Sequence, residues 1–233
     1  MEAQARELAA LCRHLHARGW VANHDGNVSH RLGDGRFLCS PTAVSKADVG
    51  PECLVVVDDE GKVVQGERRV FSEISLHLAA YRARPDVAWV VHAHPPTATG
   101  WAVAGEAFFD PPFMAEPVVS LGECIPLVSA TELPGAIAAC DAVLLANHGV
   151  LTVAKDPETA RLRMELVEHL ARIALAAKQA GGIRPIPAED VAKLLESRRK
   201  AGLGPGAKAV APVAAAAEVD VDALVREALR RVG

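Results

Sequence analysis

The chain has 233 residues, half of them hydrophobic, and a formal net charge of −4. This length suits one fairly large domain, or one domain with a tail, and the apolar fraction is enough for a sizeable core. Lys and Arg are dispersed, which argues against a nucleic-acid surface, and no apolar run has the length needed to cross a bilayer.

Cysteine usage and the start of the chain indicate a compartment. The five cysteines are scattered and none forms a C-x-x-C pair, so we expect reduced, mostly buried thiols. They are Cys12, Cys39, Cys53, Cys124 and Cys140. The first residues are charged and lack the apolar core of a secretion signal. Together these features predict a cytoplasmic protein.

The first third of the chain predicts a helix followed by hairpins. Apolar residues at helical spacing indicate a helix over 2–18, which Gly19 ends. Two hairpins are expected next, with strands at 28–32, 36–39, 53–57 and 62–65. Ser72 is the expected N-cap of a second helix, which runs to about Arg84 and ends at Pro85.

The stretch from Ala88 to Pro96 predicts a buried strand that ends at two histidines and two prolines. Successive side chains of a strand point to opposite faces, so His92 and His94 point the same way. Two imidazoles placed in this way can bind one metal ion. The alternative is a pair of partly solvated histidines at a strand end.

The remaining elements are expected in mixed order. We predict a helix after Pro96, an irregular segment over 105–120, strands at 125–128, 142–146 and 150–154, and helices at 133–140, 157–181 and 188–200. This mixture favours an α/β layered domain with a mixed, largely antiparallel sheet. We expect a catalytic domain over 1–201, followed over 202–233 by an Ala/Pro/Gly linker and an amphipathic helix. This tail is read either as a mobile extension or as a segment that covers a neighbouring subunit's site.

A third histidine, His148, also follows an apolar strand. Gly149 beside it allows a close approach of the backbone to a neighbour. Three histidines at strand ends make a site with open positions, which is typical of catalytic rather than structural zinc. Neutral imidazole suits Zn²⁺ best, and Mn²⁺, Co²⁺ and Fe²⁺ are alternatives.

Glu73 is the candidate acid/base. It lies in the first turn of the helix that leads into the His92 strand, where the helix dipole favours a carboxylate. The alternative is a capping carboxylate. His77, four residues on, shares this helical face. For His77 we favour a packing or metal-supporting role over ligation.

Five short motifs give the chain its resemblance to a known family. They are Gly26-Asn27-Val28-Ser29, Ser40-Pro41-Thr42, Ser72-Glu73 with His77, His92-Ala93-His94-Pro95 and Asn147-His148-Gly149. In this order they resemble the class II aldolase/adducin family over about residues 5–180. The likeness is closest to the fuculose-phosphate aldolase branch. The acidic-aromatic loop motif of the ribulose-phosphate 4-epimerases is missing, and the non-catalytic adducins lack the histidines that this chain keeps.

The resemblance implies a three-layer αβα fold, commonly a fourfold-symmetric homotetramer with active sites between subunits. It implies a Zn²⁺ held by His92, His94 and His148, with Glu73 as the acid/base near the metal. A metal held there would polarise adjacent carbonyl and hydroxyl oxygens of a small-molecule substrate and would stabilise the enediolate expected when a carbon–carbon bond breaks. Glu73 then moves a proton to or from that intermediate.

The substrate-binding residues implied by the resemblance depart from the family pattern. They are Gly26, Asn27, Thr42, Ala43, Phe71 and Ser72. Ala43 replaces the Gly of a Thr-Gly pair, and Phe71 replaces the first Ser of a Ser-Ser pair. Asp25 would repel a phosphate, so the pocket suits a narrower, more apolar or carboxylate-bearing substrate, unless His24 or Arg69 supplies a positive charge.

The proton donor of the aldolases is also missing. Those enzymes use tyrosine hydroxyls, whereas this chain has one tyrosine, Tyr81, expected to be packed within the Glu73 helix. The candidates for a proton donor in place of tyrosine, with no ranking among them, are Asp110, Glu116, Glu123 and Ser129. We therefore predict a metal-dependent aldolase-type lyase, with a metal-dependent decarboxylase or an adducin-like interaction module as alternatives.

Overall fold

A computed structural model describes residues 1–205 of the chain. Its strands are β1 (Asn27–Gly33), β2 (Arg36–Cys39), β3 (Val55–Val57), β4 (Val63–Gln65), β5 (Trp89–Ala93), β6 (Leu127–Val128), β7 (Ala142–Leu145) and β8 (Gly149–Ala154). Its helices are α1 (Glu2–Ala17), α2 (Ile74–Ala83), α3 (Pro96–Ala104), α4 (Ala115–Ser120), α5 (Leu133–Ala139), α6 (Pro157–Gln179) and α7 (Ala188–Lys200), with a 3-10 turn η1 (Pro51–Cys53). Beyond residue 205, the linker and the amphipathic helix predicted over 202–233 lie outside the described residues.

The strands form one sheet in the order β4-β3-β2-β1-β5-β8-β7-β6. Neighbouring strands are antiparallel except for the pair β6 and β7, which is parallel. The predicted mixed, largely antiparallel sheet is therefore confirmed. Because β5 and β7 are each antiparallel to β8, they run parallel to each other, and their carboxyl ends lie at the same edge of the sheet.

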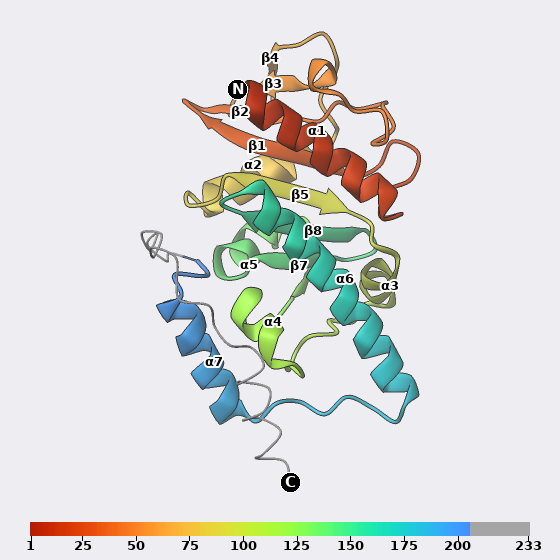
Figure 1. Ribbon diagram of the computed structural model, residues 1–233, viewed down its shortest axis with the longest axis vertical. Helices are drawn as coiled ribbons and strands as arrows, with labels where there is room; N and C mark the ends of the chain where they lie inside the picture. The colour runs from red at the N-terminus through yellow and green to blue at the C-terminus, as the bar shows by residue number, and fades with distance from the viewer. Residues whose placement is uncertain (206–233) are drawn as a thin grey trace, which may run out of the picture.

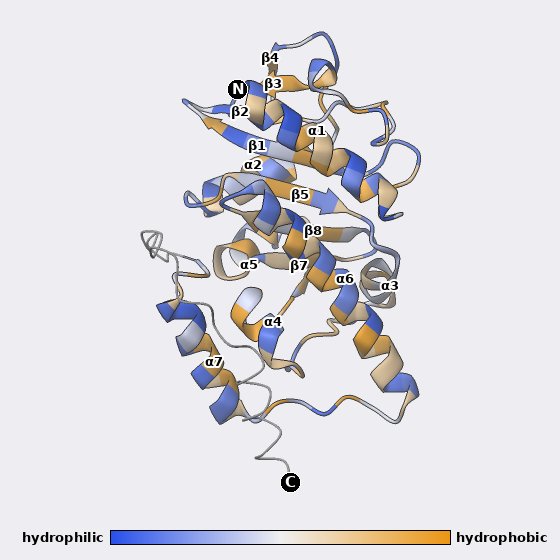
Figure 2. Cartoon of the chain, in the orientation of Figure 1, coloured by the Kyte–Doolittle hydropathy of each residue, from blue (hydrophilic) through white to orange (hydrophobic). Residues whose placement is uncertain are grey.

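Helices cover both faces of this sheet, which gives three layers (Figure 1). Helices α1, α3 and α6 pack on one face, and α2 and α5 pack on the other. Strand side chains alternate between two cores, so that Trp89 and Val91 enter the first and Val90 enters the second. Figure 2 shows hydrophobic and hydrophilic residues mixed along α1 and α6, and both helices bury apolar residues against the sheet. The three-layer αβα fold is confirmed.

Three local predictions were wrong. The segment 105–120 is not irregular throughout, because α4 occupies its end; Pro117 lies in the first turn, where its missing N–H breaks no helical bond. Helix α2 begins at Ile74, so the N-cap is Glu73 and not Ser72, and Glu73 makes no side-chain capping bond. The strand expected from residue 53 begins at Val55, after η1.

The structure gives the state of the cysteines and the character of the helices. All five cysteines are free, and three of them, Cys12, Cys39 and Cys53, are buried. Within the described residues, no helix combines the length and apolarity that crossing a membrane requires.

One buried carboxylate, at the amino-terminal end of β7, forms ion pairs with residues of helices from both faces of the sheet. Asp141 is fully buried and pairs with Arg84, which follows α2, at 3.0 Å, and with Arg163 of α6 at 2.7 Å. Arg198 of α7 also pairs with it. Asp141 precedes β7, whereas the histidines lie at or just beyond the carboxyl ends of β5 and β7, so this ion cluster and the candidate site lie at opposite ends of the strands.

We expect Asp141→Asn to lower the free energy of unfolding by about 3–5 kcal/mol, because three buried guanidinium groups would lose their shared counter-ion. Urea unfolding measures the change. The exposed Asp59 gives a matched control, and Asp59→Asn should change stability by less than about 0.5 kcal/mol. A loss below about 1 kcal/mol for Asp141→Asn would contradict the assigned role of the cluster.

Candidate metal and acid–base site

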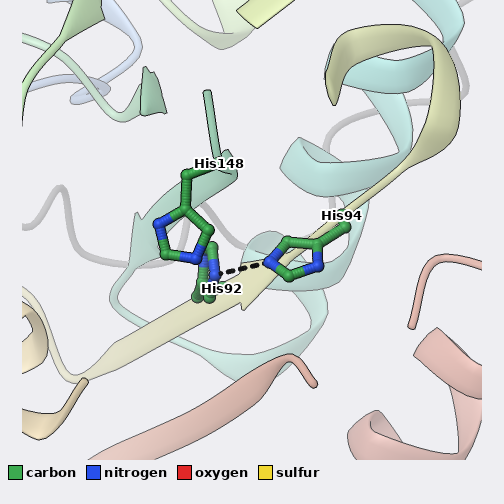
Figure 3. A group of neighbouring side chains, drawn as sticks. All are labelled: His92, His94 and His148. Carbon is green, nitrogen blue, oxygen red and sulfur yellow. Dashed lines mark hydrogen bonds between the residues drawn. The ribbon is translucent and has the colours of Figure 1, made fainter. Parts of the chain in front are cut away.

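Three imidazoles converge at the edge where β5 and β7 end (Figure 3). His92 lies near the end of β5, His94 follows that strand, and His148 lies in the turn between β7 and β8. One nitrogen from each ring lies within 4.8 Å of the others. The Nε2 atoms of His92 and His94 are 3.0 Å apart. The structure thus brings together the three side chains for which a shared ion is predicted.

The hydrogen bonds behind these rings leave metal-binding nitrogens facing one another. His92 Nδ1 lies 2.9 Å from the carbonyl oxygen of Val150, and His94 Nδ1 lies 2.9 Å from Oδ2 of Asp25. Each acceptor requires the proton on Nδ1, so in the neutral form of each ring Nε2 carries the lone pair. Two lone pairs at 3.0 Å repel each other unless a cation lies between them. The donor set therefore fits a divalent metal ion.

Burial and backbone space support the same interpretation. His92 is 1% exposed, and its burial lowers its pKa to about 4, so the ring is neutral near pH 7, as a metal ligand must be. A Cβ atom on Gly149 would lie 2.5 Å from Cδ2 of His94 and 2.7 Å from the Ala93 carbonyl oxygen. Only glycine permits this approach, which agrees with the close contact predicted at Gly149.

Glu73 faces the same centre from the start of α2. Its Oε1 lies 2.8 Å from Nε2 of His148, and its Oε2 lies 3.6 Å from Nε2 of His92. The Asn27 amide donates to Oε2 at 2.7 Å. Burial raises the pKa of Glu73, but the hydrogen bond with His148, the electrostatic interaction with His92 and the Asn27 amide outweigh it and lower the pKa to about 2. The hydrogen bond that His148 donates to Glu73 in turn raises the pKa of His148.

The two loops predicted to bind substrate lie side by side near Glu73. The Thr42 amide donates to the carbonyl oxygen of Arg69 at 3.0 Å, which joins residues 41–43 to residues 69–72. Ala43 and Ser72 are exposed and Thr42 is half-buried. Ala43 has φ 56°, a left-handed conformation that glycine adopts without strain.

The other predicted substrate residues are buried. Gly26 has φ +67°, and a Cβ there would lie 2.3 Å from a methyl carbon of Val21. Asn27 is 3% exposed, and its amide is bonded to Glu73 and His77. Phe71 packs in the second core, with its ring centroid 4.8 Å from that of His77. The structure therefore separates the set into open loop residues and buried residues behind Glu73.

The sequence interpretation gave one residue at this site, Asp25, a different role, and it gave another, Lys46, no role. Asp25 was expected to repel a phosphate, yet its carboxylate accepts from His94 Nδ1 and from the Ala22 amide. Lys46 is 1% exposed, and its ammonium donates to the carbonyl oxygen of His24 at 3.1 Å, which holds the turn that carries Asp25. No local pattern signals either contact, because the partners lie far apart along the chain.

Replacing Asp25 with Ala is expected to weaken divalent-metal affinity about 10–100-fold, as is usual when a partner behind a ligating histidine is lost. Without the carboxylate, nothing fixes the proton of His94 on Nδ1. Competition with a chromophoric chelator measures the affinity. The neighbouring His24 is exposed, so His24→Ala should bind metal like the wild type. Equal affinity of the two variants would contradict the role given to Asp25.

Three imidazoles that converge beside a carboxylate, at the edge of an α/β sheet, are a donor set of the kind that metal-dependent enzymes use. The profile described as Class II Aldolase and Adducin N-terminal domain matches residues 6–175, and the chain belongs to this family. This membership confirms the predicted resemblance and the prediction of a class II, metal-dependent aldolase-family lyase.

Individual relatives agree with this assignment. Over 204 residues the chain is 29% identical to the 5-deoxy-D-ribulose 1-phosphate aldolase of Bacillus thuringiensis serovar kurstaki, covering 83% of this chain and 94% of the relative. It is 32% identical to the 3-oxo-tetronate 4-phosphate decarboxylase of Haemophilus influenzae, covering 73% and 86%. A solved L-fuculose 1-phosphate aldolase is similar with a TM-score of 0.76 at 28% identity, covering 82% and 93%.

Proposed function

We propose that this enzyme cleaves or forms a carbon–carbon bond in a small hydroxy-carbonyl compound, with a divalent cation on His92, His94 and His148. Glu73 is its acid/base. The observation that carries the proposal is the position of the Glu73 carboxylate, 2.8 Å from Nε2 of His148 and 3.6 Å from Nε2 of His92. A substrate bound to an ion on these nitrogens would therefore lie within reach of a proton acceptor.

The protein groups have separate tasks in this reaction. When bound, the ion supplies Lewis-acid polarisation of carbonyl and hydroxyl oxygens and offsets the negative charge that develops as the bond breaks. In the synthesis direction, ionised Glu73 removes a proton from the carbon next to the carbonyl. In the cleavage direction, the protonated Glu73 returns that proton. Asn27 keeps Oε2 of Glu73 in place throughout.

The loops at residues 41–43 and 69–72 are the proposed substrate-binding region. Thr42, Ala43 and Ser72 reach the surface there, beside the helix start that carries Glu73. Relatives named as aldolases of fuculose phosphate and deoxyribulose phosphate support a sugar-phosphate-like substrate. Because Phe71 replaces a hydroxyl donor, we propose that this region binds a phosphate less firmly than a Ser-Ser pair would, or binds a carboxylate instead.

Further parts of the proposal follow the family resemblance. The resident ion is Zn²⁺, for which the all-imidazole donor set is well suited, with Mn²⁺, Co²⁺ or Fe²⁺ as alternatives. Residues 1–201 form the catalytic domain of a homotetramer whose active sites lie between subunits. Free cysteines support a cytoplasmic location. The sugar-phosphate aldolases among the relatives support a role in carbohydrate metabolism.

Aldehyde release from a substrate panel tests the proposal. The panel contains L-fuculose 1-phosphate, 5-deoxy-D-ribulose 1-phosphate, 3-oxo-tetronate 4-phosphate and 4-hydroxy-2-oxo acids, each with and without a strong chelator. Aldehyde formation that stops on metal removal and returns with Zn²⁺ is the expected result. Activity that survives complete metal removal would contradict it. CO₂ release without aldehyde would instead support a decarboxylase, the reaction named for the Haemophilus influenzae relative.

A further inference from the structure

A buried polar network extends from Glu73 into the core between α2 and β1. Its members alternate between the two elements in the order Glu73, Asn27, His77, Ser29 and Tyr81. Successive contacts are 2.7 Å, 2.7 Å, 2.6 Å and 2.9 Å long. The last four side chains are at most 3% exposed. Nothing in the proposed reaction requires hydroxyl and imidazole groups at this depth.

The alternation follows from the geometry of the two elements. Glu73, His77 and Tyr81 are spaced by four residues, which places them on one helix face and advances about 6 Å per step. Asn27 and Ser29 are spaced by two residues, which places them on one strand face and advances about 6.6 Å. The two advances are nearly equal, so the helix residues and the strand residues stay in register. Their side chains therefore contact one another in turn along the two elements.

The hydrogen bonds of the network have one possible direction. Glu73 is ionised and accepts only, so the Asn27 contact must come from its NH₂ group, and Asn27 Oδ1 is left to accept from His77 Nε2. Burial lowers the pKa of His77 to about 3, so the neutral ring carries one proton, on Nε2. Nδ1 must then accept from Ser29, and Ser29 must accept from Tyr81.

We propose that Asn27, His77, Ser29 and Tyr81 are positioning residues that fix the orientation of Glu73. The inference deepens the proposed function and rests on it. A flipped Asn27 amide would turn Oδ1 toward the Glu73 carboxylate and NH₂ toward the His77 proton. Both contacts would be repulsive, and burial leaves no water to relieve them. Each hydroxyl of the network fixes the position of the proton on the next group. Through His77 and Asn27 it thereby helps to hold the Glu73 carboxylate in one orientation.

Hydroxyl deletions at increasing distance from Glu73 test the proposal. Ser29→Ala is expected to lower kcat about tenfold to a hundredfold, as small misplacements of catalytic groups do, with KM and metal content within about twofold. Tyr81→Phe keeps the packed ring and should lower kcat only a few-fold. Thr152→Val is the matched control, because Thr152 is a fully buried hydroxyl residue of β8 that bonds to Ala160. It should keep wild-type kcat.

Substitutions at His77 supply a rescue experiment. His77→Gln can place an amide N–H where Nε2 stands and donate to Asn27, whereas His77→Leu cannot. We expect kcat to be lower for the Leu variant than for the Gln variant at equal metal content. Equal kcat for these two variants, or a Ser29→Ala kcat equal to that of Thr152→Val, would overturn the proposal.

A spectroscopic readout separates this inference from the proposed function. Nitrogen-15 NMR of the histidine rings should show wild-type His77 neutral, with its proton on Nε2, and a tautomer mixture in Ser29→Ala. A proton on Nδ1 in the wild type would overturn the inference. If the wild type turned over none of the compounds, the proposed function alone would be overturned. The His77 tautomer would still test the hydrogen-bond network.

Discussion

Replacement of Glu73 with glutamine is expected to lower kcat by about a hundredfold to ten-thousandfold, the range that one positioned acid/base contributes. The amide keeps the length and shape of the side chain and can still contact Asn27, but it cannot take up a proton at neutral pH. KM should change little, because the proposed metal ligands His92, His94 and His148 are unchanged in this variant.

Steady-state kinetics and metal analysis on the same preparation check this prediction. Glu67 is exposed, so Glu67→Gln provides a matched loss of one carboxylate and should leave kcat unchanged. If Glu73→Gln retained more than about a tenth of the wild-type kcat, proton transfer by Glu73 would not be the contribution we assign to it.

Replacement of His92 with alanine is expected to have the larger effect. His92 is the most buried ligand candidate, at 1% exposure, and its Nε2 lies near both His94 and Glu73. Its loss should leave less than one metal ion per subunit at micromolar metal. The rate should fall by at least about a thousandfold, since metal polarisation supplies several kcal/mol of transition-state stabilisation.

Metal content by mass spectrometry and aldehyde release are the measurements for His92→Ala. His16 lies exposed on α1, and His16→Ala should bind metal and turn over like the wild type. The same loss of rate should follow chelation of the wild type and should be reversed by added Zn²⁺. A fully metal-loaded His92→Ala enzyme would show that the ion lies elsewhere.

Local periodicity was sufficient to predict the main elements and the histidine cluster. Two-residue alternation places His92 and His94 on one face of a strand, and the apolar run before His148 ends at the same edge of the sheet. Gly149 was also recognisable, because a residue without Cβ between two strands indicates a close approach. These inferences depend on the nearest few residues, which determine strand faces and strand ends.

Contacts between distant segments could not be predicted in this way. Tyr81 was expected to be a packed residue, and its hydroxyl bond to Ser29 depends on how α2 lies against β1. Asp25 was interpreted by its charge, whereas its partner, His94, lies on another element. The helix α4 was missed because the prolines around it resemble loop composition.

The nearly equal distance that α2 and β1 advance between successive residues of the network constrains which insertions the sequence can accept. One inserted residue would turn the following part of the helix by about 100°, and in the strand it would move every later side chain to the opposite face. Insertions between Asn27 and Ser29, or between Glu73 and Tyr81, should therefore be tolerated far less than insertions in the turn at residues 58–61 between β3 and β4. The joint spacing of these residues is a pattern by which the same arrangement can be recognised in other sequences.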